Sequence, residues 1–313
     1  MSLFVHHMMD MDNHYPPGRS LYPFVTLQMR RIRILAQRAG GRLLGFVAYD
    51  PFREADKGEN EAVAVVERAL KSGFAGVKFY PPSGYKPLGN TKKDMSRSGK
   101  DPSRINAVNE RLFKLCVDLD APVFAHCSPG EMERWKGAGL FADPKYWRKV
   151  LEQPRFNNLR LCLAHAGGDA GWCAKPGLPV DPDFVPEVVR LCQTYPNVYC
   201  EFGHTEQLFV ESNRPYFARR LADAVTATGV RYDFGTKIMY GSDWHLLART
   251  PDVEDFDDVF RKIFRGNQTL AKYEHQFFGL NALRYLNLAD FLSRNSGSLT
   301  RQEFEYLSFL AAP

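Results

Sequence analysis

The chain has 313 residues, of which 44% are hydrophobic and 25% charged, so it can bury a sizeable core and is unlike a disordered or fibrous protein. Its 41 basic and 36 acidic residues give a net charge of +5 with no basic block longer than pairs such as Arg30-Arg31, which argues against a nucleic-acid partner. It has no run of about 18 apolar residues and no signal-peptide pattern, so we expect a cytoplasmic protein without membrane contact.

Short apolar runs alternate with longer amphipathic segments along most of the chain. The runs end in polar or Gly/Pro clusters, as buried parallel strands do. The predicted strands are 3–9, 43–49, 76–80, 122–127, 159–165, 198–202 and 237–241. The predicted helices between them are 61–71, 105–118, 144–152, 184–194, 216–228 and 256–264. This alternation predicts an α/β fold of the TIM (β/α)8-barrel type with one strand missed or missing.

Two stretches depart from the alternation. Residues 81–104 hold prolines, glycines and mixed charges without apolar periodicity, so they predict a long loop, which in a barrel would cover the active face. The tail from about residue 287 predicts two helices, with Thr300 and Glu303 at capping-box spacing. Because barrels routinely hold such a length in one domain, we expect residues 1–313 to form a single barrel domain that ends in these helices.

Ionisable residues lie at the ends of several predicted strands, where the active site of a barrel is found. They are Lys78, His126, His165 and Asp243. A single histidine at such a position is more often a satisfied core residue than a ligand. Two histidines on neighbouring strands, with an aspartate on a later strand, favour a hydrolytic zinc site with an open position for water. Such an ion lowers the pKa of bound water to about 7, and a nearby carboxylate can accept its proton.

The order of several short motifs resembles the amidohydrolase superfamily, and within it the amidohydrolase-related branch. The motifs are Ala48-Tyr49-Asp50-Pro51, Gly76-Val77-Lys78-Phe79-Tyr80-Pro81-Pro82, Ala125-His126-Cys127, Ala164-His165-Ala166-Gly167, Tyr240-Gly241-Ser242-Asp243-Trp244 and Gly279-Leu280-Asn281-Ala282. The resemblance implies that His126 binds metal, that His165 binds metal or polarises the substrate, and that Asp243 binds metal and moves protons. It also implies one divalent ion, Zn²⁺ or Mn²⁺.

The first strand of that family carries a His-x-His pair of metal ligands, and no His-x-His occurs in this sequence. Counting strands back from the aspartate makes the run 3–9 the second strand, so the first is absent. His6 and His7 are adjacent and would point to opposite faces of a strand. Asp12 and His14 have the right spacing but follow the strand, so they are either substitute ligands or loop residues. We expect a shortened sequence rather than a natural loss, and under either explanation this chain lacks two of the expected metal ligands.

Lys78 lies in a buried strand, where loss of hydration disfavours its charge unless it is paired or modified. The resemblance implies a carboxylated, metal-bridging lysine here in two-metal members. Because the branch is mostly single-metal, we favour a carboxylate partner for Lys78 or a role in binding a substrate carboxylate.

Other polar residues have weaker signals. Glu201 and His204 could reach the mouth, but we interpret them as solvated rim residues. Three residues of the long loop could contact an anionic substrate, although basic loop residues are usually just solvated; they are Tyr85, Lys86 and Lys100.

The leading hypothesis is hydrolysis of a C–N, C–O or lactone bond of a small molecule by metal-activated water, with Asp243 as base and His165 as electrophile. The alternative is non-oxidative decarboxylation of an aromatic or unsaturated carboxylic acid, which the same branch performs with the same ligands. A second alternative is a non-catalytic barrel that has lost its metal site. The absence of a His-x-His pair supports this second alternative, whereas the retention of both histidines and the aspartate opposes it. Whether the substrate carries a carboxylate and whether the chain forms a homo-oligomer stay open.

Overall fold

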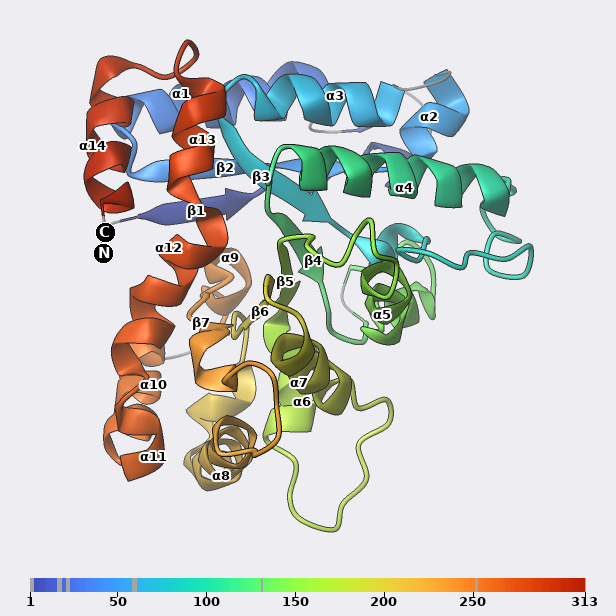
Figure 1. Ribbon diagram of the computed structural model, residues 1–313. Helices are drawn as coiled ribbons and strands as arrows, with labels where there is room; N and C mark the ends of the chain where they lie inside the picture. Colours follow the sequence, from blue (N-terminus) through green and yellow to red (C-terminus); the bar gives the residue numbers. More distant parts are fainter. Residues whose placement is uncertain are drawn as a thin grey trace.

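The computed structural model describes residues 3–15, 19–20, 23–57, 61–130, 132–250 and 253–312. A seven-stranded parallel sheet, ordered β1 to β7 along the chain, curls through its centre (Figure 1). The strands are β1 Phe4–His7, β2 Leu43–Tyr49, β3 Phe74–Phe79, β4 Val123–His126, β5 Leu161–Ala164, β6 Val198–Glu201 and β7 Ile238–Met239. Because β1 and β7 occupy the two ends of this order, the described strands do not close a ring. The prediction of a TIM-like α/β barrel that lacks one strand is confirmed.

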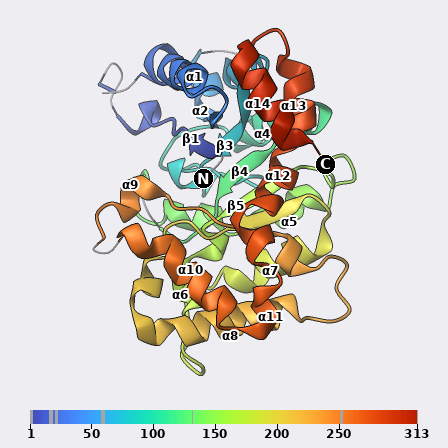
Figure 2. The ribbon, with the colours of Figure 1, turned by 90° about the vertical axis from the view of Figure 1, so that its left-hand side faces the viewer.

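Helices surround this open barrel, with α1, α3 and α4 near one end of the sheet and α7, α8 and α10 near the other (Figures 1 and 2). The helices are α1 Met29–Arg38, α2 Phe52–Lys57, α3 Glu61–Leu70, α4 Pro102–Asp118, α5 Lys145–Leu151, α6 Asp169–Trp172, α7 Val185–Thr194, α8 Arg214–Val225, α9 Trp244–Leu247, α10 Phe256–Arg265, α11 Gln268–Ala271, α12 Asn281–Leu286, α13 Leu288–Asn295 and α14 Arg301–Ala311. The stretch 81–104 contains only the short 3₁₀ turn Pro81–Ser83 and turns before α4, as predicted. No helix in the described part of the chain is long and apolar enough to cross a membrane.

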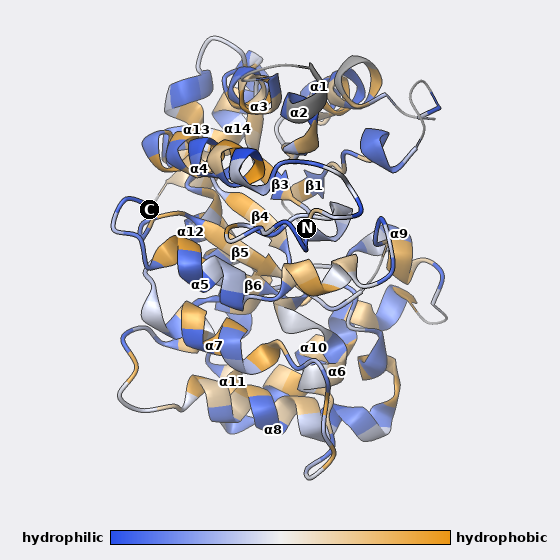
Figure 3. Ribbon diagram, turned by 90° about the vertical axis from the view of Figure 1, so that its right-hand side faces the viewer, coloured by the Kyte–Doolittle hydropathy of each residue, from blue (hydrophilic) through white to orange (hydrophobic). Residues whose placement is uncertain are grey.

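Alternate strand residues face two different hydrophobic cores, as the two-residue period of a strand requires. Phe79 and Leu163 belong to the core that includes the outer helices. Phe46 and Phe124 belong to a smaller core shared with α12, α13 and α14. The strands are mainly hydrophobic, whereas outer helices such as α8 carry many hydrophilic turns (Figure 3).

The C-terminal helices pack against the amino ends of the strands. Asn295 of α13 accepts a hydrogen bond from the N–H of Gly73, one residue before β3, at 2.7 Å. The predicted capping box of α14 is present, since Thr300 and Glu303 each bond the other's backbone N–H. Because these helices occupy the amino end of the sheet, the opposite, carboxyl end is left for the loops that follow the strands.

Candidate functional site

Two histidines meet at the carboxyl end of the sheet. His126 ends β4 and His165 directly follows β5, and both are buried. Their ring centroids lie 4.8 Å apart. The ring of Tyr80, which follows β3, lies 4.9 Å from that of His126. The structure therefore brings together two of the residues that the sequence singles out.

Glu201, which ends β6, fixes the backbone around His165. Its Oε1 accepts a hydrogen bond from the N–H of His165 at 3.0 Å, and its Oε2 accepts one from the N–H of Gly203 at 2.6 Å. The carbonyl oxygen of Gly203 lies 3.0 Å from Nδ1 of His165. Since a carbonyl only accepts, Nδ1 carries the proton, and Nε2 of the neutral ring is left as an acceptor.

The role of Glu201 corrects the sequence interpretation. Its side chain is 5% exposed, so it is not a solvated rim residue. A Cβ at Gly241, after β7, would lie 1.8 Å from Oε2 of Glu201, so a larger residue here would displace this carboxylate. The signal was available, because Glu201 ends an apolar strand as His126 does.

The backbone at His165 is itself unusual. His165 and Ala166 have φ of 60° and 47°, in the left-handed region that non-glycine residues seldom adopt. The carbonyl of Ala166 accepts a hydrogen bond from the indole N–H of Trp172 at 2.8 Å. Strained residues held by such contacts cluster at functional sites, which supports a functional role for this segment.

Lys78 lies beside the histidines. It is 6% exposed, and its ammonium group lies 4.6 Å from the ring centroid of Phe124. Burial, and then the charges of His165 and Lys78, lower the pKa of His126 well below its usual value, so His126 is neutral near pH 7. His7 of β1 stacks on the same Phe124 ring at 3.5 Å. The centre of the mouth thus combines one buried lysine with His126, which burial keeps neutral.

Asp243 follows β7 and lies beside a further histidine, His245. It precedes α9 with φ of 50°, and its Oδ1 lies 3.2 Å from Nδ1 of His245. No group of three or more His, Cys, Asp or Glu side chains that could hold a metal ion is found among the described residues. These residues therefore supply the pair His126 and His165 without completing the predicted ligand set.

Sequence comparison decides the family. A model of the amidohydrolase family matches residues 18–288. The chain belongs to the amidohydrolase family. The resemblance that the motif order indicates is therefore confirmed. A search of curated protein sequences gave no match.

Solved structures share the fold of this amidohydrolase at low sequence identity. A Pseudomonas putida protein with proposed 2-pyrone-4,6-dicarboxylic acid hydrolase activity has a TM-score of 0.50 and 14% identity over 82% of this chain and 76% of its own. A proposed metal-dependent hydrolase from Lactobacillus casei has the same TM-score of 0.50 and 14% identity over 92% of this chain and 74% of its own. A manganese-bound 5-carboxyvanillate decarboxylase from Novosphingobium aromaticivorans has a TM-score of 0.44 and 12% identity over 83% of this chain and 69% of its own.

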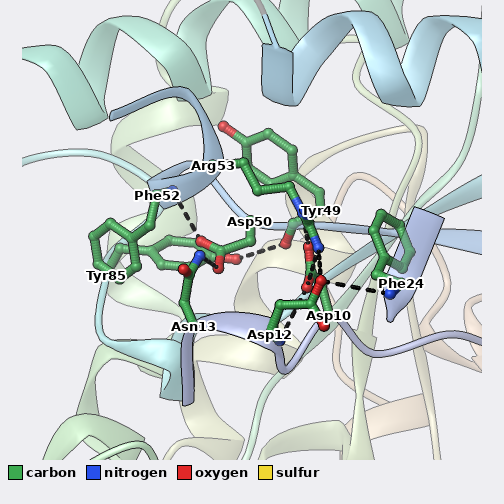
Figure 4. Close-up of polar contacts among 9 residues, drawn as sticks. All are labelled: Asp10, Asp12, Asn13, Phe24, Tyr49, Asp50, Phe52, Arg53 and Tyr85. Atoms are coloured by element: carbon green, nitrogen blue, oxygen red, sulfur yellow. Dashed lines mark hydrogen bonds and ion pairs between the residues drawn. The ribbon is translucent and has the colours of Figure 1, made fainter. Parts of the chain in front are cut away.

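In this amidohydrolase the acidic residues after β1 bind an arginine (Figure 4). The guanidinium of Arg53 donates to both carboxylate oxygens of Asp10 and, at 2.5 Å, to Asp12. His14 instead has Nε2 3.0 Å from Oγ of Ser83. Asp12 and His14 thus turn to separate partners, as loop residues do, and do not form a ligand pair.

Two of the loop residues considered for substrate contact also have partners. The hydroxyl of Tyr85 is buried and donates to the carbonyl oxygen of Tyr49 at 3.0 Å. Lys86 forms an ion pair with Asp94 at 2.7 Å. Both residues therefore hold the long loop in place.

Asp50, which follows β2, is a buried acid in the same region (Figure 4). Its carboxylate accepts hydrogen bonds from the side chain of Asn13 at 2.7 Å and the N–H of Phe52 at 2.9 Å. Burial, and then the charge of Asp10, raise the pKa of Asp50 to about 7. In the folded protein Asp50 therefore keeps a proton that the unfolded chain releases at about pH 4.

The raised pKa of Asp50 predicts a specific pH dependence of the free energy of unfolding. The stabilisation from protonated Asp50 is complete below about pH 4 and is lost as the pH rises towards about 7, because only the folded state holds the proton in that range. The variant Asp50→Asn cannot ionise, so its free energy of unfolding should fall less than that of the wild type between these limits. Urea unfolding at several pH values measures the free energy of unfolding of the variant and of the wild type. The exposed Asp118→Asn serves as the control, and an Asp50→Asn profile parallel to the wild type would contradict the prediction.

Proposed function

We propose that this amidohydrolase hydrolyses a C–N, C–O or lactone bond of a small molecule, with His126, His165 and Asp243 as the residues that carry the chemistry. The observation that carries the proposal is the buried pair of imidazoles, 4.8 Å apart at the mouth of the barrel. The hydrogen bonds of Glu201 and Gly203 fix the orientation of one of them. Such preorganisation is what general acid–base catalysis requires.

The family implies one divalent ion, Zn²⁺ or Mn²⁺, which when bound supplies an activated water. Nε2 of His165 is free of the Gly203 contact and suits such a ligand role. However, the described residues bring no third donor to His126 and His165, so they do not by themselves fit an ion. The side chains of this chain can nevertheless bind the substrate and move protons.

We assign the base to His165 rather than to Asp243, the base that the sequence analysis predicts, because a hydrogen bond fixes the ring of His165. With Nδ1–H held on Gly203, Nε2 can accept a proton from a water molecule as it attacks the carbonyl carbon of the substrate. The ammonium group of Lys78 provides positive charge in a buried setting, where it can stabilise the oxyanion that develops. As the bond to the leaving oxygen or nitrogen breaks, His165 returns that proton to the leaving atom. The new carboxylic acid then releases its own proton to solvent, to which Asp243, with a side chain 23% exposed, is open.

Non-oxidative decarboxylation is the second candidate. Lys78 lies over the Phe124 ring at 4.6 Å and 5.7 Å from the Tyr80 ring, so a carboxylate paired with it would have an aromatic, poorly hydrated setting. Loss of a charged group as CO₂ is favoured where its hydration is weak.

Two assays separate these reactions. The purified chain, with and without added Zn²⁺ or Mn²⁺, is incubated with a pyrone carboxylate lactone and with a resorcylate-type acid. We expect proton release at constant pH from the lactone. CO₂ release from the acid instead would favour the decarboxylase. Neither reaction, together with less than about a tenth of an equivalent of bound metal, would favour a non-catalytic barrel, because metal-assisted hydrolysis requires the ion.

A further inference from the structure

Arg134 lies at the same mouth, in the loop that follows β4. Its backbone N–H donates to the carbonyl oxygen of Pro82 at 2.9 Å, which joins this loop to the one after β3. The ring of Trp135 packs against Gly84, where an added Cβ would lie 2.2 Å from it. Pro82 is two residues from Tyr80, whose ring faces His126 at 4.9 Å. These contacts place Arg134 in the same group of loops, at the carboxyl end of the sheet, as the histidine pair.

The guanidinium group of Arg134 is half-buried and has no polar partner among the residues that the structure describes. Its Nη1 is buried and makes no hydrogen bond, and its other N–H groups donate to no described residue either. Its contacts are with aromatic rings, 5.1 Å from the ring centroid of Phe52 and 5.5 Å from that of Trp135. A buried, unpaired cationic donor is costly unless something else supplies an acceptor.

The other buried and half-buried arginines in the described ranges all have such an acceptor. Each of them pairs with a carboxylate or donates to a backbone carbonyl; they are Arg33, Arg53, Arg148, Arg160, Arg214, Arg220, Arg261 and Arg294. The comparison with Arg53 is the most direct, because it lies in α2, which follows β2, and binds both Asp10 and Asp12 (Figure 4). Arg134 differs from this set in having only rings around it.

Glu133, next to Arg134 in the chain, and the two acidic residues after β1 are already engaged. Glu133 accepts hydrogen bonds from the N–H groups of Gly137 and Gly139, both at 2.9 Å. Asp10 and Asp12 bind Arg53. Burial, and then the charge of Arg134, lower the pKa of His14 to about 4, so this ring is neutral at pH 7 and is no anionic partner for Arg134. None of these groups therefore supplies an acceptor to the guanidinium group of Arg134.

We infer that Arg134 binds a carboxylate group of the substrate, while the bond that reacts lies at His126 and His165. Rings lie close to the guanidinium, and its hydrogen-bond donors stay available for the bidentate geometry that guanidinium and carboxylate share. The inference rests on the proposed function and narrows its substrates to small acids with a carboxylate besides the reacting bond. The aromatic rings of Phe52, Trp135 and Tyr80 favour a planar acid.

Binding without turnover tests this assignment. The chain is titrated calorimetrically with isophthalate, with its uncharged analogue isophthalamide and with inorganic phosphate. We expect saturable binding of isophthalate to the wild type and binding of the other two about tenfold weaker or less. Arg134→Gln should weaken isophthalate binding by about 10- to 100-fold, since a charge-assisted hydrogen bond is lost. Arg134→Lys, which keeps the charge but not the planar fork, should weaken it less.

A matched control is Arg231→Gln. Arg231 also lies over a ring, that of Tyr232 at 5.4 Å, but it is exposed and precedes β7 at the other end of the barrel. The Arg231→Gln variant should bind isophthalate as tightly as the wild type does. Circular dichroism checks that each variant is folded. If Arg134→Gln does not fold, the binding of isophthalate by Arg134→Lys tests the inference instead.

Several outcomes would overturn the inference. They are unchanged isophthalate binding by both Arg134 variants, equal binding of isophthalamide or phosphate by the wild type, and no saturable binding of isophthalate at all. His165→Gln removes the proposed chemistry and should keep the binding. If it loses binding while the Arg134 variants keep it, the carboxylate lies at the histidines instead. Absence of turnover with intact, Arg134-dependent binding would contradict only the proposed function.

Discussion

Replacing Arg53 with methionine is expected to lower the free energy of unfolding by about 3–5 kcal/mol, because it leaves a buried charge without its partner. Arg53 is 4% exposed and Asp10 is 5% exposed, and the guanidinium contacts both oxygens of that carboxylate. Methionine keeps apolar volume against the ring of Phe24, which lies 4.9 Å from the guanidinium carbon. The loss therefore measures the uncompensated carboxylate rather than a cavity.

The loss should grow with pH. Burial raises the pKa of Asp10, and its bonds to Arg53 oppose that rise. Without Arg53 the folded-state pKa rises further above its unfolded value of about 4, so the variant loses stability as the pH increases above that value. Below about pH 4 the carboxyl is protonated in both states, and the difference between variant and wild type should shrink. Urea unfolding at acid and neutral pH measures both limits.

The exposed pair of Arg301 and Glu305 provides the control, at 2.7 Å and with side chains 91% and 61% exposed. Arg301→Met should change the free energy of unfolding by no more than about 0.5 kcal/mol. The double variant Asp10→Asn, Arg53→Met should recover part of the loss, since it removes the charge as well as its partner. Equal losses in Arg53→Met and Arg301→Met would show that the buried pair has no special role.

The strands and the histidine pair were predictable because the signals are local. A buried parallel strand is a short apolar run, and β2 begins and ends at the predicted residues. His126 and His165 each end such a run, and the carboxyl ends of neighbouring parallel strands meet at one edge of the sheet. Helix α1 was missed although its residues 29–38 are helical, because no element was assigned between the first two strands.

The supporting contacts could not be predicted in the same way. The carboxylate of Glu201 and the backbone N–H of His165 are far apart in sequence, and only the pairing of β5 with β6 brings them together. Arg134 lies in an irregular loop, where neither a hydrophobic period nor the end of a strand indicates a functional residue. Its unpaired guanidinium is visible only when every neighbouring acid has been placed.

Asp243 illustrates a third limit. Strand counting puts it at the mouth, but β7 has only two residues and the chain turns at φ of 50° before α9. The direction of a side chain after a strand depends on such dihedral angles, and these are not read from the order of motifs. The role of Asp243 therefore stays a prediction.

Replacing His165 with glutamine is expected to lower kcat/KM for lactone hydrolysis about 10²- to 10⁴-fold, because a positioned proton acceptor is lost. The amide N–H of glutamine can still donate to the carbonyl oxygen of Gly203, which His165 contacts at 3.0 Å, so the local structure has a replacement bond. The amide has no group that takes up a proton near neutral pH. Initial rates across a range of pH values measure the change. The fall in kcat/KM at acid pH, which reports protonation of the base in the wild type, should be absent in the variant.

Glu201→Gln separates support from proton transfer. Its carboxylate receives two backbone N–H groups, from His165 and Gly203, whereas an amide turns its own NH₂ group towards one of them. We therefore expect a smaller loss of about tenfold in kcat, a retained pH profile and a lower melting temperature. If His165→Gln keeps its rate within about twofold while Glu201→Gln loses it, Nε2 of His165 is not the proton acceptor and the carboxylate acts on the reaction by another route.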